Sequence, residues 1–282
     1  MPALDGDSNE GETEVERRDF LAASAVTGIG LGVTGLSGEP LPDEIDARSP
    51  RREGRKILIA GGGFRTEFIA YMAELTGKSR PRICYLPTAS ADSATGSIRF
   101  YEYCATLNVE PHVQDSFISS YSQDRSWEEV FLSMDGIVVS GGNTLNQQAI
   151  WRAQGIDEVL REAWDRGIVL GGSSAGSLCW FEEGTTDSRP KEVGKIECLG
   201  FLRGSHSPHY DGEAVRRPTY HRLIQSGELK PGYACDNDAG IYFEDNEVAR
   251  VVKTRAEAKV YHVALEGGRV VETELPAEMI GG

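Results

Sequence analysis

Lysine, paired cysteines and long apolar runs are scarce or missing in this 282-residue chain, and each scarcity excludes a class of protein. The five cysteines are an odd number and form no Cys-x-x-Cys pair, which argues against a disulfide framework and a zinc site. No run of about 18 apolar residues occurs in the body of the chain, so nothing there predicts stable membrane insertion. We therefore expect a globular enzyme or binding protein that needs no metal and no cofactor.

Positive charge is also in short supply. The chain has 44 acidic and 29 basic residues and a formal net charge of −15, and only seven of the basic residues are lysines. Such a field repels phosphate backbones, so we expect no nucleic-acid partner. An acidic surface with little lysine is also typical of proteins in concentrated salt, because screening removes the cost of self-repulsion. A salt-rich habitat is therefore a hypothesis for this protein.

The first 55 residues differ in composition from the rest. Residues 1–16 are acidic and polar, which is typical of disorder. Arg17 and Arg18 then precede a weakly apolar Ala/Gly run at residues 22–33, a pattern that resembles a twin-arginine export signal. The alternative is a disordered tail with an Arg-Arg pair by chance, which would leave the protein in the cytoplasm. Either way, the sequence predicts a disordered region with a linker over residues 1–55.

From residue 56 to residue 282 we expect one folded domain, in which short apolar stretches alternate with amphipathic ones. Strands are predicted at residues 56–60, 82–87, 109–113, 136–140, 240–243, 247–253, 260–266 and 269–273, and helices at residues 66–75, 96–107, 127–134, 145–153 and 156–166. The alternation implies an α/β fold with a mostly parallel sheet covered on both faces. The strands after residue 233 are joined by Gly or Asn turns, which predicts a C-terminal antiparallel β extension along one sheet edge.

The most informative segment runs from Gly167 to Gly176, where a short apolar strand leads into Gly-x-Ser-x-Gly with Ser174 at its centre. This is the sequence form of a nucleophile elbow, in which a sharp strand-to-helix turn exposes one hydroxyl above the sheet edge. Gly172 stands where a Cβ would collide with neighbouring backbone, and the amide of Ala175 points to the same place as the hydroxyl. The alternative is a glycine-rich loop that only turns or holds an anion, but the preceding strand favours catalysis.

A serine hydroxyl needs a base, and histidine suits this role near neutral pH. Three of the five histidines lie in regular strand or helix patterns, which favours structural roles: His112, His221 and His262. His206 and His209 fall in an expected loop whose proline fixes its shape, and histidines held by rigid backbone are better candidates.

The remaining parts of such a site are expected on neighbouring loops. Glu182, Glu183 and Asp187 follow the elbow and could supply the acid, although each could equally be a solvated surface charge. A second oxyanion donor is expected from residues 140–144, whose glycines let the backbone approach a ligand. Asn143 in that loop is a candidate for substrate binding, and it can also cap the following helix.

Taken together, these segments resemble the peptidase E (aspartyl dipeptidase) family of serine peptidases, which also includes cyanophycinase-like enzymes. The shared markers, in order, are Ser140-Gly141-Gly142-Asn143-Thr144, Gly172-Ser173-Ser174-Ala175-Gly176, Thr185-Thr186-Asp187 and Ser207-Pro208-His209-Tyr210. The resemblance covers most of residues 56–250. It implies a flavodoxin-like, doubly wound fold related to class I glutamine amidotransferases, with serine where those enzymes have cysteine.

The resemblance implies a serine-type peptidase that hydrolyses short peptides, including dipeptides with an N-terminal aspartate. It implies Ser174 as the nucleophile and His209 as the base. It suggests Asp187 as the acid of the triad, with Glu182 or Glu183 as the fallback. The expected partner is a small peptide substrate, and the sequence predicts no oligomeric state.

The resemblance also implies the groups that would bind the substrate. The oxyanion donors would be the backbone amides of Gly142 and Ala175. Arg216 or Arg217 would bind the aspartate of the substrate, because a guanidinium binds a carboxylate with paired hydrogen bonds.

Two other interpretations stay open at this point. An α/β-hydrolase esterase has its triad in the same order of serine, acid and histidine, although the span from Ser174 to His209 is short for that fold. A catalytically silent binding protein could keep an amidotransferase-like fold without its activity, since fold does not guarantee function.

Overall fold

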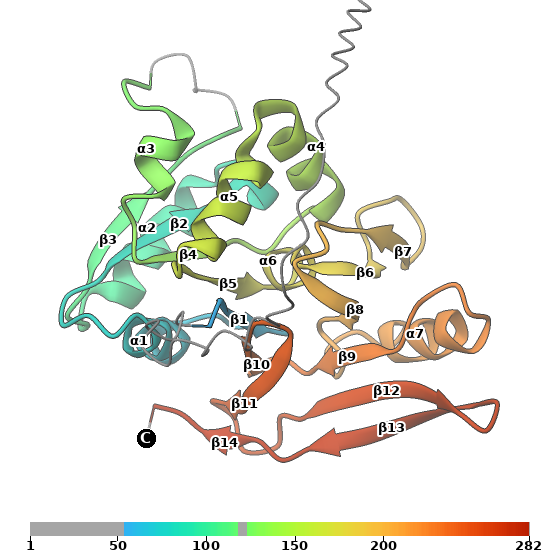
Figure 1. Cartoon of the computed structure of the whole chain (residues 1–282). Coiled ribbons are helices and arrows are strands. Elements are labelled where there is room, and N and C mark those ends of the chain that lie inside the picture. Colours follow the sequence, from blue (N-terminus) through green and yellow to red (C-terminus); the bar gives the residue numbers. More distant parts are fainter. Residues whose placement is uncertain (1–53, 118–122, 282) are drawn as a thin grey trace, which may run out of the picture. The chain divides into compact units, whose positions relative to one another are not determined.

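The computed structural model describes residues 54–117 and 123–281 (Figure 1). The expected export signal at Arg17 and Arg18 lies outside the described residues, as does nearly all of the expected linker. No helix in the described part of the chain is long and apolar enough to cross a membrane.

The first sheet has eight strands. They are β1 (Lys56–Ala60), β2 (Arg82–Leu86), β3 (Glu110–Val113), β4 (Gly136–Val139), β5 (Val169–Ser173), β10 (Ala239–Glu244), β11 (Glu247–Lys253) and β14 (Glu278–Met279). Their order across the sheet is β14-β11-β10-β1-β5-β4-β2-β3. The strands β1 to β5 are parallel to one another, whereas β10 pairs antiparallel with β1, and β11 with β10. Read from the opposite edge, the parallel strands lie in the order β3-β2-β4-β5-β1. This is the flavodoxin order 2-1-3-4-5 when β2 is counted as the first strand and β1 as the last.

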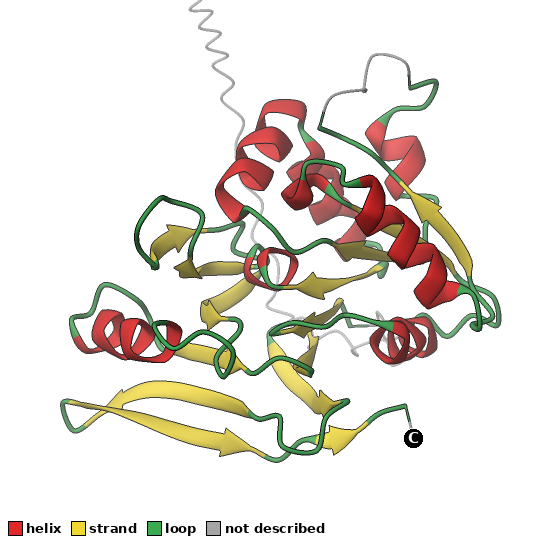
Figure 2. Cartoon of the chain, turned by 180° about the vertical axis from the view of Figure 1, so that it is seen from behind, coloured by secondary structure: helices red, strands yellow, loops and turns green. Residues whose placement is uncertain are grey.

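Helices cover both faces of this sheet (Figures 1 and 2). The helices around it are α1 (Thr66–Leu75), α2 (Ala94–Cys104), α3 (Trp127–Phe131), α4 (Thr144–Gln154), α5 (Ile156–Asp165) and α6 (Ala175–Leu178), with a 3-10 turn η1 (Thr88–Ser90). A further helix, α7 (Arg216–Gln225), packs against the second sheet. Leu58 of β1 packs in one cluster with α1 and α2, while Ile57 and Ile59 pack in another with α3, α4 and α5. Because successive residues of a strand point to opposite faces, burial on both sides explains the unbroken apolar run of β1.

A second sheet contradicts part of the expected arrangement. Its strands are β6 (Phe181–Thr186), β7 (Gly194–Glu197), β8 (Leu202–Ser207), β9 (Gly232–Cys235), β12 (Val260–Glu266) and β13 (Arg269–Leu275). It is a mixed sheet in the order β13-β12-β9-β8-β6-β7. The C-terminal extension therefore divides between two sheets, and only β10, β11 and β14 extend the first. The sequence did not predict strands β6 to β9, because they are short and rich in polar residues. These residues become buried only when the strands pair with one another and the sheet packs.

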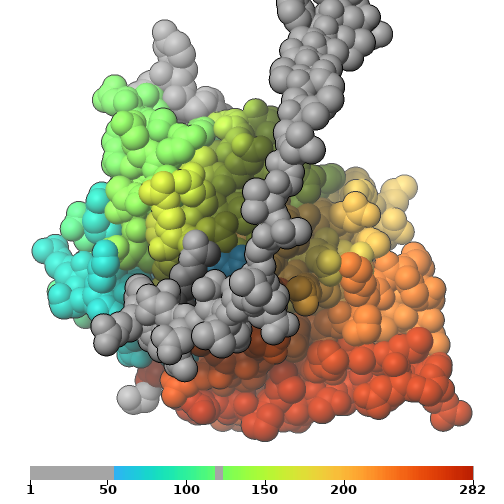
Figure 3. Space-filling view, viewed as in Figure 1, coloured from blue at the N-terminus to red at the C-terminus, as the bar shows by residue number. Residues whose placement is uncertain are grey.

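The hairpin of β12 and β13 runs along one edge of the second sheet. Seven residue pairs join the two strands, and the turn at Gly267 and Gly268 has positive φ at both positions. Val263 of this hairpin packs against Tyr220 and Leu223 of α7. In Figure 3 the C-terminal residues, in red, lie directly against the orange residues before them. The hairpin is thus part of the same packed body as α7.

Local sequence patterns were most accurate for the first sheet. The predicted bounds of β1, α1 and β11 agree with the structure residue for residue. All five cysteines are free and four are buried, where they act as small apolar side chains.

Candidate active site

Ser174 lies on a sharp turn between β5 and α6. Its backbone has φ 57° and ψ −118°, a region that side chains other than glycine rarely adopt. A Cβ at Gly172 would lie 2.3 Å from the carbonyl oxygen of Val139, and one at Gly176 would lie 2.2 Å from the same atom. Both glycines therefore allow a backbone approach that no other residue permits. The predicted strand, sharp turn and helix are all present, and Ser174 is only partly buried.

Three successive backbone carbonyls at the carboxyl end of β1 hold three distant parts of the chain. The carbonyls of residues 60–62 accept hydrogen bonds from the amides of Ser174, His209 and Asp238, at 3.3, 3.3 and 2.9 Å respectively. Ligand sites of open α/β sheets lie at this end of the strands. The elbow, the loop that carries His209 and the turn after β9 therefore meet at one point.

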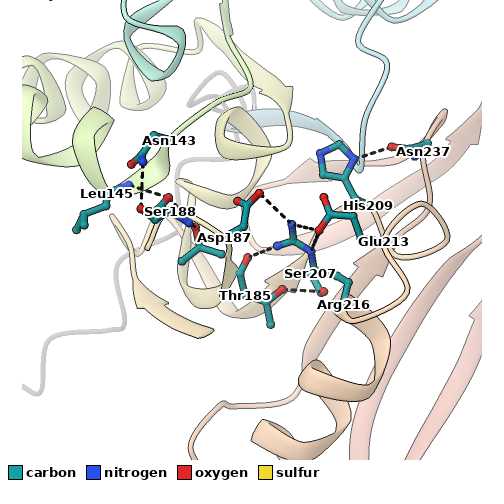
Figure 4. Close-up of polar contacts among 11 residues, drawn as sticks. Asn143, Leu145, Thr185, Asp187, Ser188, Ser207, His209, Glu213, Arg216 and Asn237 are labelled. Atoms are coloured by element: carbon teal, nitrogen blue, oxygen red, sulfur yellow. Dashed lines mark hydrogen bonds and ion pairs between the residues drawn. The ribbon is translucent and has the colours of Figure 1, made fainter. Parts of the chain in front are cut away.

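His209 is oriented by an amide rather than by a carboxylate. Its Nδ1 lies 2.7 Å from Oδ1 of Asn237 (Figure 4). An amide oxygen only accepts hydrogen bonds, so Nδ1 carries the proton and Nε2 keeps a lone pair. A Cβ at Gly62 would lie 2.1 Å from that Oδ1 and 3.0 Å from the histidine ring, so glycine leaves room for the pair.

Asn237 is itself firmly held. The backbone amide of Asn237 donates to Oδ1 of Asp211 at 2.8 Å, and its backbone carbonyl accepts from Arg255 at 3.0 Å. Arg255 also pairs with Asp211 at 2.5 Å, which closes the network. Sequence reasoning missed Asn237. The signal that could have found it is the polar run at residues 236–238 between two apolar strands, where a strand-end loop reaches the site.

The glutamates expected as fallback acids have other partners. Glu182 accepts from the amide of Gly204 at 2.7 Å and pairs with Lys230 at 2.9 Å. These contacts, the backbone bond first, lower the pKa of Glu182. Glu183 is buried, accepts from the amide of Lys230 at 2.6 Å and pairs with Lys195 at 2.6 Å. Both carboxylates therefore stabilise the second sheet and its connections.

Asp187, the expected acid, is exposed and lies 3.9 Å from the buried guanidinium of Arg216 (Figure 4). Within residues 54–117 and 123–281, neither Asp187 nor either glutamate is hydrogen-bonded to His209. The structure places Asn237 in the position where sequence reasoning expected a carboxylate. Asp187 was a plausible choice because it follows the elbow closely in sequence, but the histidine ring turns to the end of β9 instead.

The second candidate base, His206, lies in β8 rather than in a loop. It is fully buried, stacks on Phe181, and its ring nitrogens lie 3.0 Å from Oγ of Ser177 and 3.0 Å from the carbonyl of Tyr233. Burial lowers the pKa of His206 to about 3, so the ring is neutral at physiological pH. Because Ser177 lies one turn after Ser174, His206 contacts the helix that follows the elbow.

The two expected oxyanion donors differ in their surroundings. The amide of Ala175 opens helix α6, where the first amides have no acceptor within the helix. Gly142 has φ 139°, and a Cβ there would lie 2.1 Å from the carbonyl of Ala89. Its neighbour Gly141 borders the nucleophile, since a Cβ at Gly141 would lie 3.8 Å from Oγ of Ser174. The loop at residues 140–144 therefore does reach the serine, as expected.

Asn143 acts as a cap and a tether. Its Oδ1 accepts from the amide of Asn146 at 2.9 Å, which caps α4, and its Nδ2 donates to the carbonyl of Ser188 at 3.1 Å. The side chain expected to bind substrate thus already has protein partners at both ends.

The expected carboxylate clamp is not formed by free guanidinium groups. Arg216 is buried, donates to the carbonyl of Thr185 at 3.1 Å, and donates twice to Glu213 at 3.0 and 2.6 Å. Arg217 forms two hydrogen bonds to Glu272. Sequence reasoning did not anticipate these contacts, because the acidic partners of both arginines cannot be recognised from local pattern.

The fold and the strained serine at a strand end define an α/β enzyme of the class that uses a serine nucleophile. The chain belongs to Peptidase family S51, whose profile it matches over residues 57–251, and it is therefore a serine peptidase. The membership decides against the α/β-hydrolase esterase. The chain is also 42% identical over 231 residues to the uncharacterized peptidase YgaJ of Bacillus subtilis (strain 168), covering 80% of this chain and 98% of that protein.

Two solved structures share the fold at low sequence identity. A peptidase from an acI-B1 actinobacterium superposes with a TM-score of 0.63 at 16% identity, covering 81% of this chain and 97% of the other. A protein of Listeria monocytogenes EGD-e proposed to be a peptidase E superposes with a TM-score of 0.51 at 16% identity, covering 79% and 100%.

Proposed function

We propose that this peptidase cleaves short peptides with Ser174 as nucleophile, His209 as base and Asn237 as the group that orients the base. The observation that carries the proposal is the convergence of their three segments on the carbonyls of residues 60–62. In this scheme Oγ of Ser174 attacks the scissile carbonyl carbon, while Nε2 of His209 takes the hydroxyl proton and later gives it to the leaving amine.

The oxyanion that forms during the attack needs donors already in place. The amide of Ala175 is suited by its position at the start of α6, and the loop at residues 140–144 supplies a second donor beside the serine. Asparagine in the third position has a precedent in Cys-His-Asn proteases, where it also orients the histidine.

The preference for an N-terminal aspartate, which the resemblance suggests, has less support. Around Arg216, two carboxylates, Glu213 and Asp187, face one guanidinium. This side of the site therefore carries net negative charge and would repel a substrate carboxylate. Rates on matched Asp-X and Asn-X dipeptides test the preference, and equal rates would remove aspartate from the proposal.

The nucleophile is tested with a fluorophosphonate probe and a panel of short peptides. We expect the wild type to be labelled and Ser174→Ala to be unlabelled, with turnover lower by about 10³- to 10⁶-fold, as for removal of a triad serine. Ser173→Ala, one residue earlier, is the matched control and should keep its labelling. Labelling or near-normal turnover in Ser174→Ala would overturn the proposal. A folded wild type that is neither labelled nor active would instead support a silent binding protein.

A further inference from the structure

His206 has no part in the proposed reaction, yet its ring lies where three segments of the site meet. It is fully buried in β8, the strand that leads to His209. Its Nε2 lies 3.0 Å from Oγ of Ser177 in α6, the helix that begins directly after Ser174. Its Nδ1 lies 3.0 Å from the backbone carbonyl of Tyr233 in β9. The ring therefore joins α6, β8 and β9, whose ends carry the nucleophile, the base and the residue that orients the base.

The direction of these hydrogen bonds follows from their partners. A backbone carbonyl only accepts, so Nδ1 of His206 carries the proton of the neutral ring and Nε2 is an acceptor. The Ser177 hydroxyl can donate to this Nε2 or, at 2.8 Å, to the carbonyl of Ser174. That carbonyl already accepts from the backbone amides of Ser177 and Leu178, at 3.0 and 2.9 Å, which occupy both of its lone pairs. The hydroxyl proton therefore stabilises the structure most when it is donated to His206.

Helix α6 depends on contacts of this kind. It comprises only Ala175–Leu178, and a single helical turn is not stable by itself. Gly184 of β6 lets the helix approach the second sheet, because a Cβ there would lie 2.5 Å from the side chain of Leu178 and 2.1 Å from the carbonyl of His206. Phe181 stacks on the ring of His206 with ring centroids 4.9 Å apart, which holds the plane of the ring. The ring that contacts α6 is thus itself fixed in place.

We propose that His206 is a positioning residue, which sets Oγ of Ser174 against Nε2 of His209 through its hydrogen bond to Ser177. The inference rests on the proposed function, because it concerns the spacing of that nucleophile and that base. The carbonyls of residues 60–62 join the same segments at the end of β1, and His206 joins them a second time within the second sheet. Contacts at two separate points restrict rotation of the elbow relative to the base. A misplacement of about 1 Å can lower a rate about 100-fold, so this restriction bears on turnover.

Two substitutions of His206 separate its hydrogen bonds. Asparagine places an N–H group near the position of Nδ1, so His206→Asn keeps the bond to Tyr233 and loses the bond to Ser177. Glutamine places its amide oxygen near the position of Nε2, so His206→Gln keeps the bond to Ser177. We expect His206→Asn to lower kcat and the rate of fluorophosphonate labelling together, by about 10- to 100-fold, with KM unchanged. His206→Gln should recover most of both rates.

Ser177→Ala removes the same hydrogen bond from the other side, and it carries the test if His206→Asn does not fold. We expect a similar loss in Ser177→Ala. The double variant should be no slower than either single variant, because both changes remove one contact. The acid limb of the pH–rate profile should stay in place throughout, since His209 remains the base.

The matched control is Ser205→Ala, one residue earlier in β8. Ser205 is buried, and its Oγ lies 2.7 Å from the hydroxyl of Tyr220 and 2.6 Å from the carbonyl of Lys230. Because successive residues of a strand point to opposite faces, these contacts lie on the face away from Ser177. Ser205→Ala should lower the denaturant midpoint and leave the labelling rate of the folded protein unchanged.

The outcomes separate this role from the proposed function. Unchanged rates in Ser177→Ala and in folded His206→Asn, an equal loss in Ser205→Ala, no recovery with glutamine, or losses that add in the double variant would overturn the positioning role alone. A wild type that is neither labelled nor active would overturn the proposed function, and the role of His206 would fall with it.

Discussion

At the scale of single residues, His209 is hydrogen-bonded to an asparagine where sequence reasoning expected a carboxylate. Asn237 is neutral, so it can hold the tautomer and direction of His209 but adds no charge to stabilise an imidazolium. Its own position is fixed by Asp211 and Arg255. We infer that orientation, rather than a buried charge, is what this residue contributes.

Replacing Asn237 separates these two contributions. Asn237→Ala should lower kcat by about 10- to 100-fold, the usual cost of removing a group that orients an active residue. Asn237→Asp keeps the shape and adds a charge that favours protonated His209, so the acid limb of the pH–rate profile should move to higher pH. Both are measured as kcat and kcat/KM across pH. Unchanged kcat in the alanine variant, or an unmoved acid limb in the aspartate variant, would contradict the role.

At the scale of elements, the hairpin of β12 and β13 is tied to the site through Glu272 of β13. Its carboxylate accepts hydrogen bonds from Tyr210 and Arg217 and lies 2.6 Å from Nε2 of His221. Burial acts to raise the pKa of Glu272, but these three partners outweigh it and lower the pKa. Because Tyr210 directly follows His209, the hairpin helps to fix the position of His209 even though it lies beyond the residues 57–251 that match the family.

Glu272→Gln should therefore weaken both stability and turnover. We expect unfolding to be easier by about 1–3 kcal/mol, because the buried Tyr210 and its neighbours Arg217 and His221 lose a charged acceptor. A carboxyl with a lowered pKa stabilises the fold above its unfolded value, so the difference from wild type should shrink as pH falls below 4.5. Denaturant midpoints across pH measure this.

The matched control for this change is Glu274→Gln on the same strand. Glu274 pairs with Lys259 at 2.8 Å, and both side chains are about half exposed. Such a surface pair contributes little, so the control should change stability by less than about 1 kcal/mol. If the two variants behave alike, Glu272 does not anchor the hairpin to the catalytic region.

At the scale of the whole molecule, net charge is the dominant feature. The formal net charge of −15 opposes the compact state through self-repulsion. Salt reduces this repulsion over short distances. The Debye length falls from about 10 Å at about 0.1 M salt to about 3 Å at about 1 M.

The melting temperature should therefore rise between about 0.1 M and about 1 M NaCl, as the Debye length shortens. Each kcal/mol gained corresponds to about 2–4 °C for a protein of this size. Calorimetry measures the change, and sucrose at matched osmolality is the control, because it alters water activity without screening charge. A melting temperature that is flat or falls with NaCl would remove the hypothesis of a salt-rich habitat.

The sequence by itself determined the parts of this protein that depend on neighbours along the chain. The apolar run of β1, the periodicity of α1 and the Gly-x-Ser-x-Gly turn around Ser174 are all local, because a strand, a helix and a tight turn each follow from a few adjacent residues. Two glycines with a serine between them leave the backbone little choice of conformation. The expected loop left His206 and His209 as candidate bases, and the family resemblance chose His209.

Tertiary structure decided which side chains meet. Asn237 reaches His209 from 28 residues away, and Arg216 is occupied by partners on other elements, Thr185 among them. His206 reaches Ser177 only because β8 and α6 pack together. Such pairings arise from strand order and from the burial of polar groups with whatever partner is near. No pattern of adjacent residues records them, because the free energy that selects them comes from contacts between distant segments.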